Sequence, residues 1–112
     1  MADSFKSFTL QGTGTVYTVP TANQNSQPPV LPTTTLIKSI YLSNQSGGAV
    51  ATTVTMLDSS NSNLEVELYK DSLGDAAETQ VLESPVVLEQ ADQIKLTGAD
   101  VKILINLMEI TA

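Results

Sequence analysis

The amino-acid sequence predicts an all-β fold, an antiparallel β-sandwich of about eight or nine short strands. Strand-forming residues such as threonine, valine, isoleucine, tyrosine and leucine dominate the segments between turns. Apolar and polar side chains alternate with a period of two in most of these segments, which is typical of a half-buried strand. No window shows the helical period with caps, and residues 75–78 form the only candidate for a helical turn.

Segments rich in glycine, proline, asparagine, aspartate and serine separate the predicted strands. By residue number, the strands are expected at 7–10, 15–19, 34–43, 49–57, 64–69, 78–83, 86–88, 93–97 and 101–110, with a loop at 70–77. In strand 34–43, alternation places Leu36, Ile40 and Leu42 on one face and Ile37 and Tyr41 on the other. Because so many inward residues need two facing sheets, a jelly-roll-like or immunoglobulin-like sandwich is favoured over a single meander.

The last predicted strand, 101–110, is the longest apolar run in the chain. One face carries Val101, Ile103, Ile105 and Leu107, followed by Glu109, and we expect it to face the core. The other face carries Lys102, Leu104, Asn106, Met108 and Ile110 and is about half apolar. A small isolated sheet would leave this second face in water, so Leu104, Met108 and Ile110 are candidates for a contact with another surface.

The chain of 112 residues has the length of one domain, 1–112, interrupted by a proline-rich arm or long loop at 20–33. Val30 and Leu31 stand in this arm between Pro28, Pro29 and Pro32. An extended segment of this kind loses little entropy on docking, so the arm either covers its own sheet or lies on a neighbouring molecule. The aromatic residues Phe5 and Phe8 are likewise either intersubunit anchors or part of the local core.

Composition excludes several functions. The chain contains no cysteine, histidine or tryptophan, and its five basic residues are all lysines against a net charge of −7. A nucleic-acid or anionic-membrane partner is therefore not expected. No run approaches the length of a membrane helix, and no signal peptide is visible at the start of the sequence. We also expect no metal and no cofactor.

Catalysis is not expected, because the usual bases are missing. A serine–lysine pair exists at Lys38 and Ser39, but it reads as a solvated strand edge. Glu65 and Glu67 share a strand face, yet their alternation with apolar residues is what any half-buried strand shows. The oxygen-rich segment 58–63 lacks the acidic and glycine positions of the helical calcium loop, which leaves an ordinary surface loop as the default and a non-standard calcium site as the alternative.

Three segments carry a family resemblance: IKSIYLSN at 37–44 before a glycine turn, VTMLDSS at 54–60, and PVVLEQADQIKLT at 85–97 before the final strand. Their order over residues 36–110 resembles small structural proteins of tailed-bacteriophage virions. Ala91 stands where that pattern usually has a glycine before the turn aspartate. The shared motifs are hairpin turns and strands, and none is a catalytic signature.

The resemblance implies a non-enzymatic virion protein, assembled in the host cytoplasm, that forms a homo-oligomer (a trimer is favoured) and binds capsid subunits as a head decoration, or cement, protein. A neck or tail component is the alternative. From another class, a carbohydrate-binding adhesin would need an aromatic platform, for which the chain offers Tyr17, Tyr41 and Tyr69. The predicted interface residues are Phe5, Phe8, Pro28, Pro29, Val30, Leu31, Leu104, Met108 and Ile110.

Overall fold

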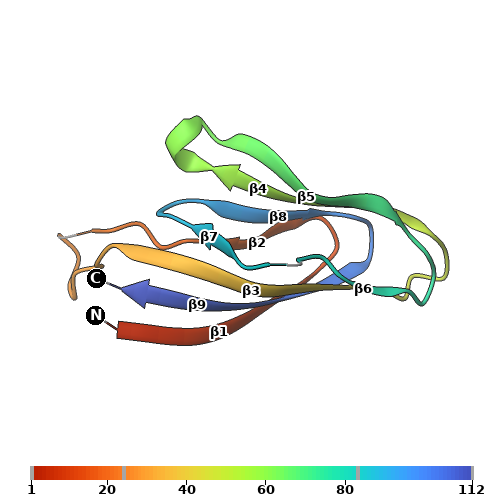
Figure 1. Ribbon diagram of the computed structural model, residues 1–112, viewed down its shortest axis with the longest axis horizontal. Coiled ribbons are helices and arrows are strands. Elements are labelled where there is room, and N and C mark those ends of the chain that lie inside the picture. The colour runs from red at the N-terminus through yellow and green to blue at the C-terminus, as the bar shows by residue number, and fades with distance from the viewer. Residues whose placement is uncertain (1, 24, 83, 112) are drawn as a thin grey trace.

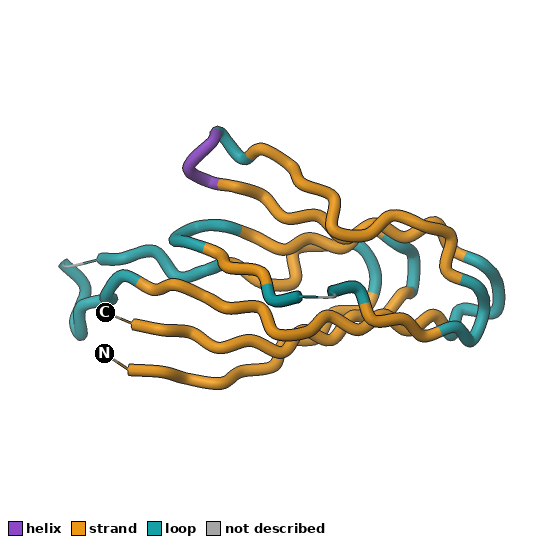
Figure 2. Tube along the Cα trace, viewed as in Figure 1, coloured by secondary structure: helices purple, strands orange, loops and turns teal. Residues whose placement is uncertain are grey.

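A computed structural model of the chain describes residues 2–23, 25–82 and 84–111. Its strands form two antiparallel sheets that pack face to face, so the predicted β-sandwich is confirmed (Figure 1). The strands are β1 (Ala2–Gln11), β2 (Gly14–Thr18), β3 (Thr33–Asn44), β4 (Val50–Asp58), β5 (Leu64–Leu73), β6 (Glu78–Gln80), β7 (Val86–Leu88), β8 (Gln93–Thr97) and β9 (Val101–Thr111). Within these residues the helical content is a single 3₁₀ turn, η1 (Ser59–Asn61), at the tip of the β4–β5 hairpin (Figure 2).

The strand order is that of a jelly roll. Sheet A has the order β1-β9-β3-β6, with β7 also paired to β3, and sheet B has the order β2-β8-β4-β5. If β6 and β7 are taken as one interrupted strand, the pairs are nested: β1 with β9, β2 with β8, β3 with β6 and β7, and β4 with β5. A long hairpin folded over itself into two sheets gives this pattern, so the jelly-roll alternative describes the chain better than the immunoglobulin-like one.

The core lies between the sheets and is aliphatic. The four residues of β9 predicted to face it, Val101, Ile103, Ile105 and Leu107, are all buried. Ile94 and Leu96 of β8 face them from sheet B and are also buried. A period of two on both β8 and β9 thus supplies the two inner faces that the sandwich needs.

A β-bulge at Lys38 changes the faces predicted for β3. Ile37 pairs with Leu107 and Ser39 with Asn106, so Lys38 is the extra residue. Because of this extra residue, side chains before the bulge point to the face opposite to the one that uninterrupted alternation would give them. Ile37 is fully buried and Leu36 lies on the outer face, which corrects their predicted positions, whereas Ile40, Leu42 and Tyr41 lie as expected.

Three strand boundaries differ from prediction by three residues or more, and several others by one residue. β1 begins at Ala2, β5 continues to Leu73, and β6 ends at Gln80. The predicted loop at 70–77 was wrong for residues 70–73, because their backbone pairs with residues 50–53 of β4 although three of the four side chains are polar. Residues 75–78, the only candidate for a helical turn, form no helix: residues 75 and 76 make a tight turn and β6 begins at Glu78.

A buried polar network ties both sheets together near the termini. The Tyr17 hydroxyl, from sheet B, donates a hydrogen bond of 2.6 Å to the Glu109 carboxylate and lies 2.7 Å from the Thr35 hydroxyl. Lys6 forms an ion pair with Glu109, with 2.6 Å between Nζ and Oε1. Burial alone raises the pKa of Glu109, but the hydrogen bonds from Lys6 and Tyr17 outweigh it and hold that pKa below its usual value. Burial raises the pKa of the Tyr17 hydroxyl, and the hydrogen bond to Glu109 raises this pKa further.

Candidate interaction surface

The outer face of sheet A carries a continuous line of apolar side chains across four strands. Strand register places Phe5 of β1 opposite Met108 of β9, Met108 opposite Leu36 of β3, and Leu36 opposite Val87 of β7. We call these four residues the apolar row. Phe5 is 70% exposed and Val87 is 58% exposed, while Met108 and Leu36 between them are half-buried. Opposed residues on one face of a sheet are close neighbours, so the four form one surface.

A polar ladder runs beside the apolar row. The Ser7 hydroxyl donates a 2.8 Å hydrogen bond to the Asn106 side-chain carbonyl, and the Asn106 amide donates a 3.0 Å bond to the Ser39 hydroxyl. The Lys38 ammonium, from the bulge, lies 5.2 Å from the centroid of the Phe5 ring, a cation–π contact. Every side chain of the ladder therefore has a partner within the chain.

Beyond the ladder, the same face is hollowed into a groove of about 710 Å³. Two further rows line it, and register again sets their order. Thr9, Leu104, Tyr41 and Gln80 form one row, and Gln11, Lys102, Ser43 and Glu78 form the next. All of these except Gln80 line the groove. The outer face of sheet A is thus divided into an apolar half near the termini and a grooved half near β6.

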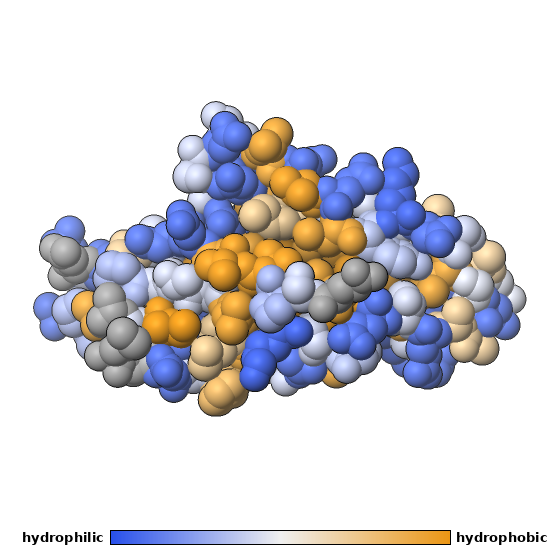
Figure 3. Space-filling view, in the orientation of Figure 1, coloured by the Kyte–Doolittle hydropathy of each residue, from blue (hydrophilic) through white to orange (hydrophobic). Residues whose placement is uncertain are grey.

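A second apolar surface lies on one flank of the sandwich. The tip of the β4–β5 hairpin turns away from sheet A (Figures 1 and 2), and apolar residues gather at the centre of this flank (Figure 3). Val66 pairs with Met56, which pairs with the buried Ile94, so Val66 and Leu64 belong to the inner face of sheet B. They are nevertheless 43% and 52% exposed, respectively.

The predicted interface residues are distributed over several places. Phe5 and Met108 belong to the apolar row and Leu104 to the groove. Ile110 lies on the same outer face, between Asp3 and Thr34. Phe8 lies on the inner face, with its ring centroid 4.9 Å from that of Tyr17, a position that favours the local-core alternative.

The arm lies at the end of the sandwich, near both termini (Figure 1). Its residues Pro28, Pro29, Val30 and Leu31 are all exposed, and one backbone bridge joins Val30 to Asn23. None of these residues lines the groove that contains Leu104, and Met108 pairs with Phe5 and Leu36. The exposure of Val30 and Leu31 leaves both side chains available to another molecule.

Sequence reasoning missed two members of the apolar row, Leu36 and Val87. Uninterrupted alternation groups Leu36 with Ile40 and Leu42, and the bulge at Lys38 turns it to the opposite face. Val87 is the middle residue of a three-residue apolar strand, where period two assigns it to the face opposite Val86 and Leu88. The sequence did contain a signal for this surface, because Val87 is an apolar residue at a position that alternation turns outward.

Among the described residues, no group of three histidine, cysteine, aspartate or glutamate side chains could hold a metal ion. The described part of the chain also has no helix that is long and apolar enough to cross a membrane. Comparisons with protein-family models, with curated proteins and with solved structures find no match for this chain.

Proposed function

We propose that this chain is a non-enzymatic structural protein of a tailed-phage virion, a head decoration (cement) protein that forms a homo-oligomer, with a trimer favoured, and binds capsid subunits. The apolar row on sheet A is the observation that carries the proposal. Two further features support it: the resemblance of residues 36–110 to small virion proteins, and the jelly-roll strand order, which capsid domains commonly use. The second feature is an analogy of fold alone.

The apolar row has the properties of a protein-binding site. Contiguous apolar surface on a folded protein commonly marks an interaction site. The row stands on four hydrogen-bonded strands, so its backbone is fixed before binding and little ordering is required. Phe5, the most exposed large hydrophobic residue among those described, supplies an aromatic anchor of the kind that dominates interface energetics.

The buried carboxylates support binding over catalysis. Glu109 and Asp92 are the buried acidic residues among those described. Glu109 is held by Lys6 and Tyr17. Asp92 accepts hydrogen bonds from the Ser59 amide and hydroxyl and from the Glu89 amide. Because their oxygens are committed to structural bonds, neither group is positioned as a general acid or base.

The proposal is tested by light scattering on the full chain and by co-sedimentation with capsids that lack it. We expect an oligomer in solution and co-sedimentation with capsids. Leu36→Glu puts a charge in the centre of the apolar row and should weaken both by more than about tenfold. The matched control is Thr97→Glu, an exposed change of the same charge on β8 in the other sheet, which should behave as wild type.

A strictly monomeric chain with no affinity for capsids would overturn the proposal. So would a folded Leu36→Glu variant that binds as well as wild type, with folding checked by circular dichroism. Co-sedimentation with tails in place of capsids would assign the neck or tail alternative and reject decoration.

A further inference from the structure

We propose that the groove on the outer face of sheet A, built around Tyr41 and Leu104, binds a neutral saccharide. This inference does not rest on a role in a virion, because it uses the grooved half of sheet A and makes no use of the apolar row. A volume of about 710 Å³ suits a small ligand of a few sugar rings.

Tyr41 provides the aromatic platform that sugar binding needs. Its side chain is 44% exposed, whereas Tyr17 is buried and Tyr69 packs partly against the core. Tyr41 pairs with Leu104 on β9, so the ring and an aliphatic side chain lie together on the floor of the groove. Such a floor matches the apolar face that the C–H groups of a pyranose ring present.

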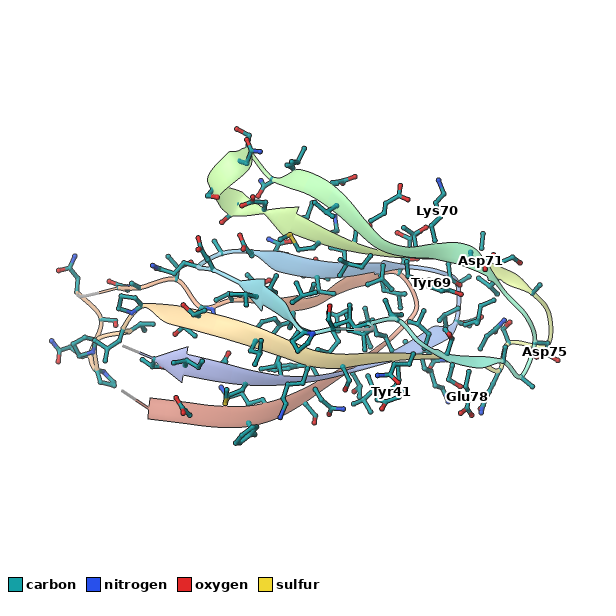
Figure 4. The ribbon with its side chains drawn as sticks, in the orientation of Figure 1. Tyr41, Tyr69, Lys70, Asp71, Asp75 and Glu78 are labelled. Carbon is teal, nitrogen blue, oxygen red and sulfur yellow. The ribbon has the colours of Figure 1, made fainter. Side chains whose placement is uncertain are left out.

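Polar side chains of several kinds surround this floor. Thr9 and Ser43 offer hydroxyls, Gln11 an amide, Lys102 an ammonium and Glu78 a carboxylate. Figure 4 shows Tyr41 and Glu78 projecting from the same side of sheet A, away from β5. Sugar hydroxyls both donate and accept hydrogen bonds, and this set contains groups of both kinds.

These polar groups are uncommitted, in contrast to the adjacent ladder. Ser7, Asn106 and Ser39 bond to one another, so the ladder is internally satisfied. Within the described residues, the side chains of the groove's polar set form neither hydrogen bonds nor ion pairs with the rest of the chain. Their bonding capacity faces water and is free for a ligand.

The balance of charge selects a neutral sugar over a charged one. Lys102 and Glu78 occupy the same row on either side of Ser43, so the groove carries one charge of each sign. Because these two charges cancel, the groove offers neither an anionic nor a cationic sugar a net attraction. A sulfated or sialylated glycan would also meet a chain of net charge −7 around the groove.

The test is a glycan array probed with the labelled full chain, followed by titration of the strongest neutral binder into ¹⁵N-labelled protein. We expect neutral oligosaccharides to bind at submillimolar to millimolar concentration, with amide shifts centred on Tyr41, Leu104 and Lys102. Tyr41→Ala should weaken binding by at least about tenfold, and Tyr41→Phe should retain most of it because the ring is kept. Leu64→Ala removes an exposed apolar side chain from β5 of the other sheet and should leave the affinity unchanged.

Thermal melting of Tyr41→Ala separates loss of binding from loss of fold. The inference is overturned if no neutral glycan binds at millimolar concentration, if only charged glycans bind, or if a folded Tyr41→Ala variant binds as wild type. It is also overturned if the groove amides shift with protein concentration alone, since that would assign the groove to a second copy of the chain.

Discussion

Ala91 lies in the left-handed region of the backbone, with φ of 65°, in the tight turn before β8. A side chain other than glycine is strained there. We expect Ala91→Gly to increase the free energy of unfolding by about 0.5–1 kcal/mol. Urea denaturation monitored by fluorescence or circular dichroism measures the change.

The control for this substitution is Ala51→Gly, on an exposed position of β4. There the backbone is extended and glycine only adds freedom to the unfolded chain, so stability should fall. A decrease at both positions would show that strain at Ala91 is not significant.

Glu109 makes stability depend on pH. Because its pKa is lowered in the folded chain, the carboxylate stabilises the fold fully above its unfolded pKa, about 4.3, and this contribution is lost as pH falls through the lower folded value. Glu109→Gln should therefore be destabilised at pH 7, and its deficit relative to wild type should shrink as the pH falls below about 4. Denaturation midpoints of both proteins between neutral and acidic pH measure the difference.

Glu65→Gln is the matched control, since Glu65 is an exposed carboxylate on β5 that forms none of the ion pairs found here. Its stability should differ little from that of wild type at any of these pH values. An acid dependence in Glu109→Gln identical to that of wild type would contradict the role given to the Tyr17–Glu109–Lys6 network.

At the scale of elements, the bulge in β3 makes an unusual deletion tolerable. Removing Lys38 restores a regular strand, with Ile37 and Ile40 still facing inward and Leu36 and Ser39 still facing outward. We expect this variant to fold and to lose no more than about 1–2 kcal/mol. Removing Tyr41, from the regular part of the same strand, should unfold the protein. The side chains on one side of the deletion would then have to point to the opposite face of the sheet. Circular dichroism and thermal melting distinguish the two deletions.

The arm provides a second prediction at this scale. Residues 27–32 are all exposed, so deleting them removes no core contact and the melting temperature should change little. If the arm lies on a neighbouring molecule, the same deletion should reduce the oligomer mass seen by light scattering or the binding to capsids. Unfolding of the deletion variant would instead support an arm that stabilises its own domain.

Strand positions could be predicted from the sequence because alternation on a half-buried strand is a local property. The strand predictions fail where backbone pairing with a neighbouring strand outweighs the local pattern of apolar and polar side chains. Residues 70–73 are strand because β4 continues beside them, and 2–6 because β9 does, although Ser4 and Lys6 occupy inward positions that show no apolar pattern. The bulge at Lys38 has no local signal, since lysine is ordinary in either geometry.

For the whole molecule, net charge and apolar association oppose each other. Copies with a charge of −7 repel, and they must approach if the apolar row joins them. Raising the sodium chloride concentration from about 0.1 M to about 1 M shortens the screening length from about 10 Å to about 3 Å, so the oligomer should become tighter. Light scattering over a dilution series at each concentration tests this, and weakening with salt would indicate an interface held by complementary charges.

The candidate surface could be predicted only in part from the sequence. Period two identified Met108 and Leu104 as outward apolar residues. Joining Met108 with Phe5, Leu36 and Val87 requires the order of four strands, which is set by contacts between distant segments and has no signature in any one of them. The groove depends on the same order, because its lining comes from β1, β9, β3 and β6.

The nested pairing of the jelly roll has a consequence for how the chain reaches this structure. β1 has β9 as its strand partner, with Ala2 opposite Thr111, and β9 also lies between β1 and β3 in sheet A. Sheet A is therefore complete only when β1 pairs with β9. This pairing closes a loop of nearly the whole chain and carries the large loss of entropy that such a loop requires. We expect folding in milliseconds to seconds, as in other proteins of high contact order. During synthesis, the apolar strands in the first half of the chain stay unpaired until the second half has been made. We expect the chain to be most prone to aggregation at this stage.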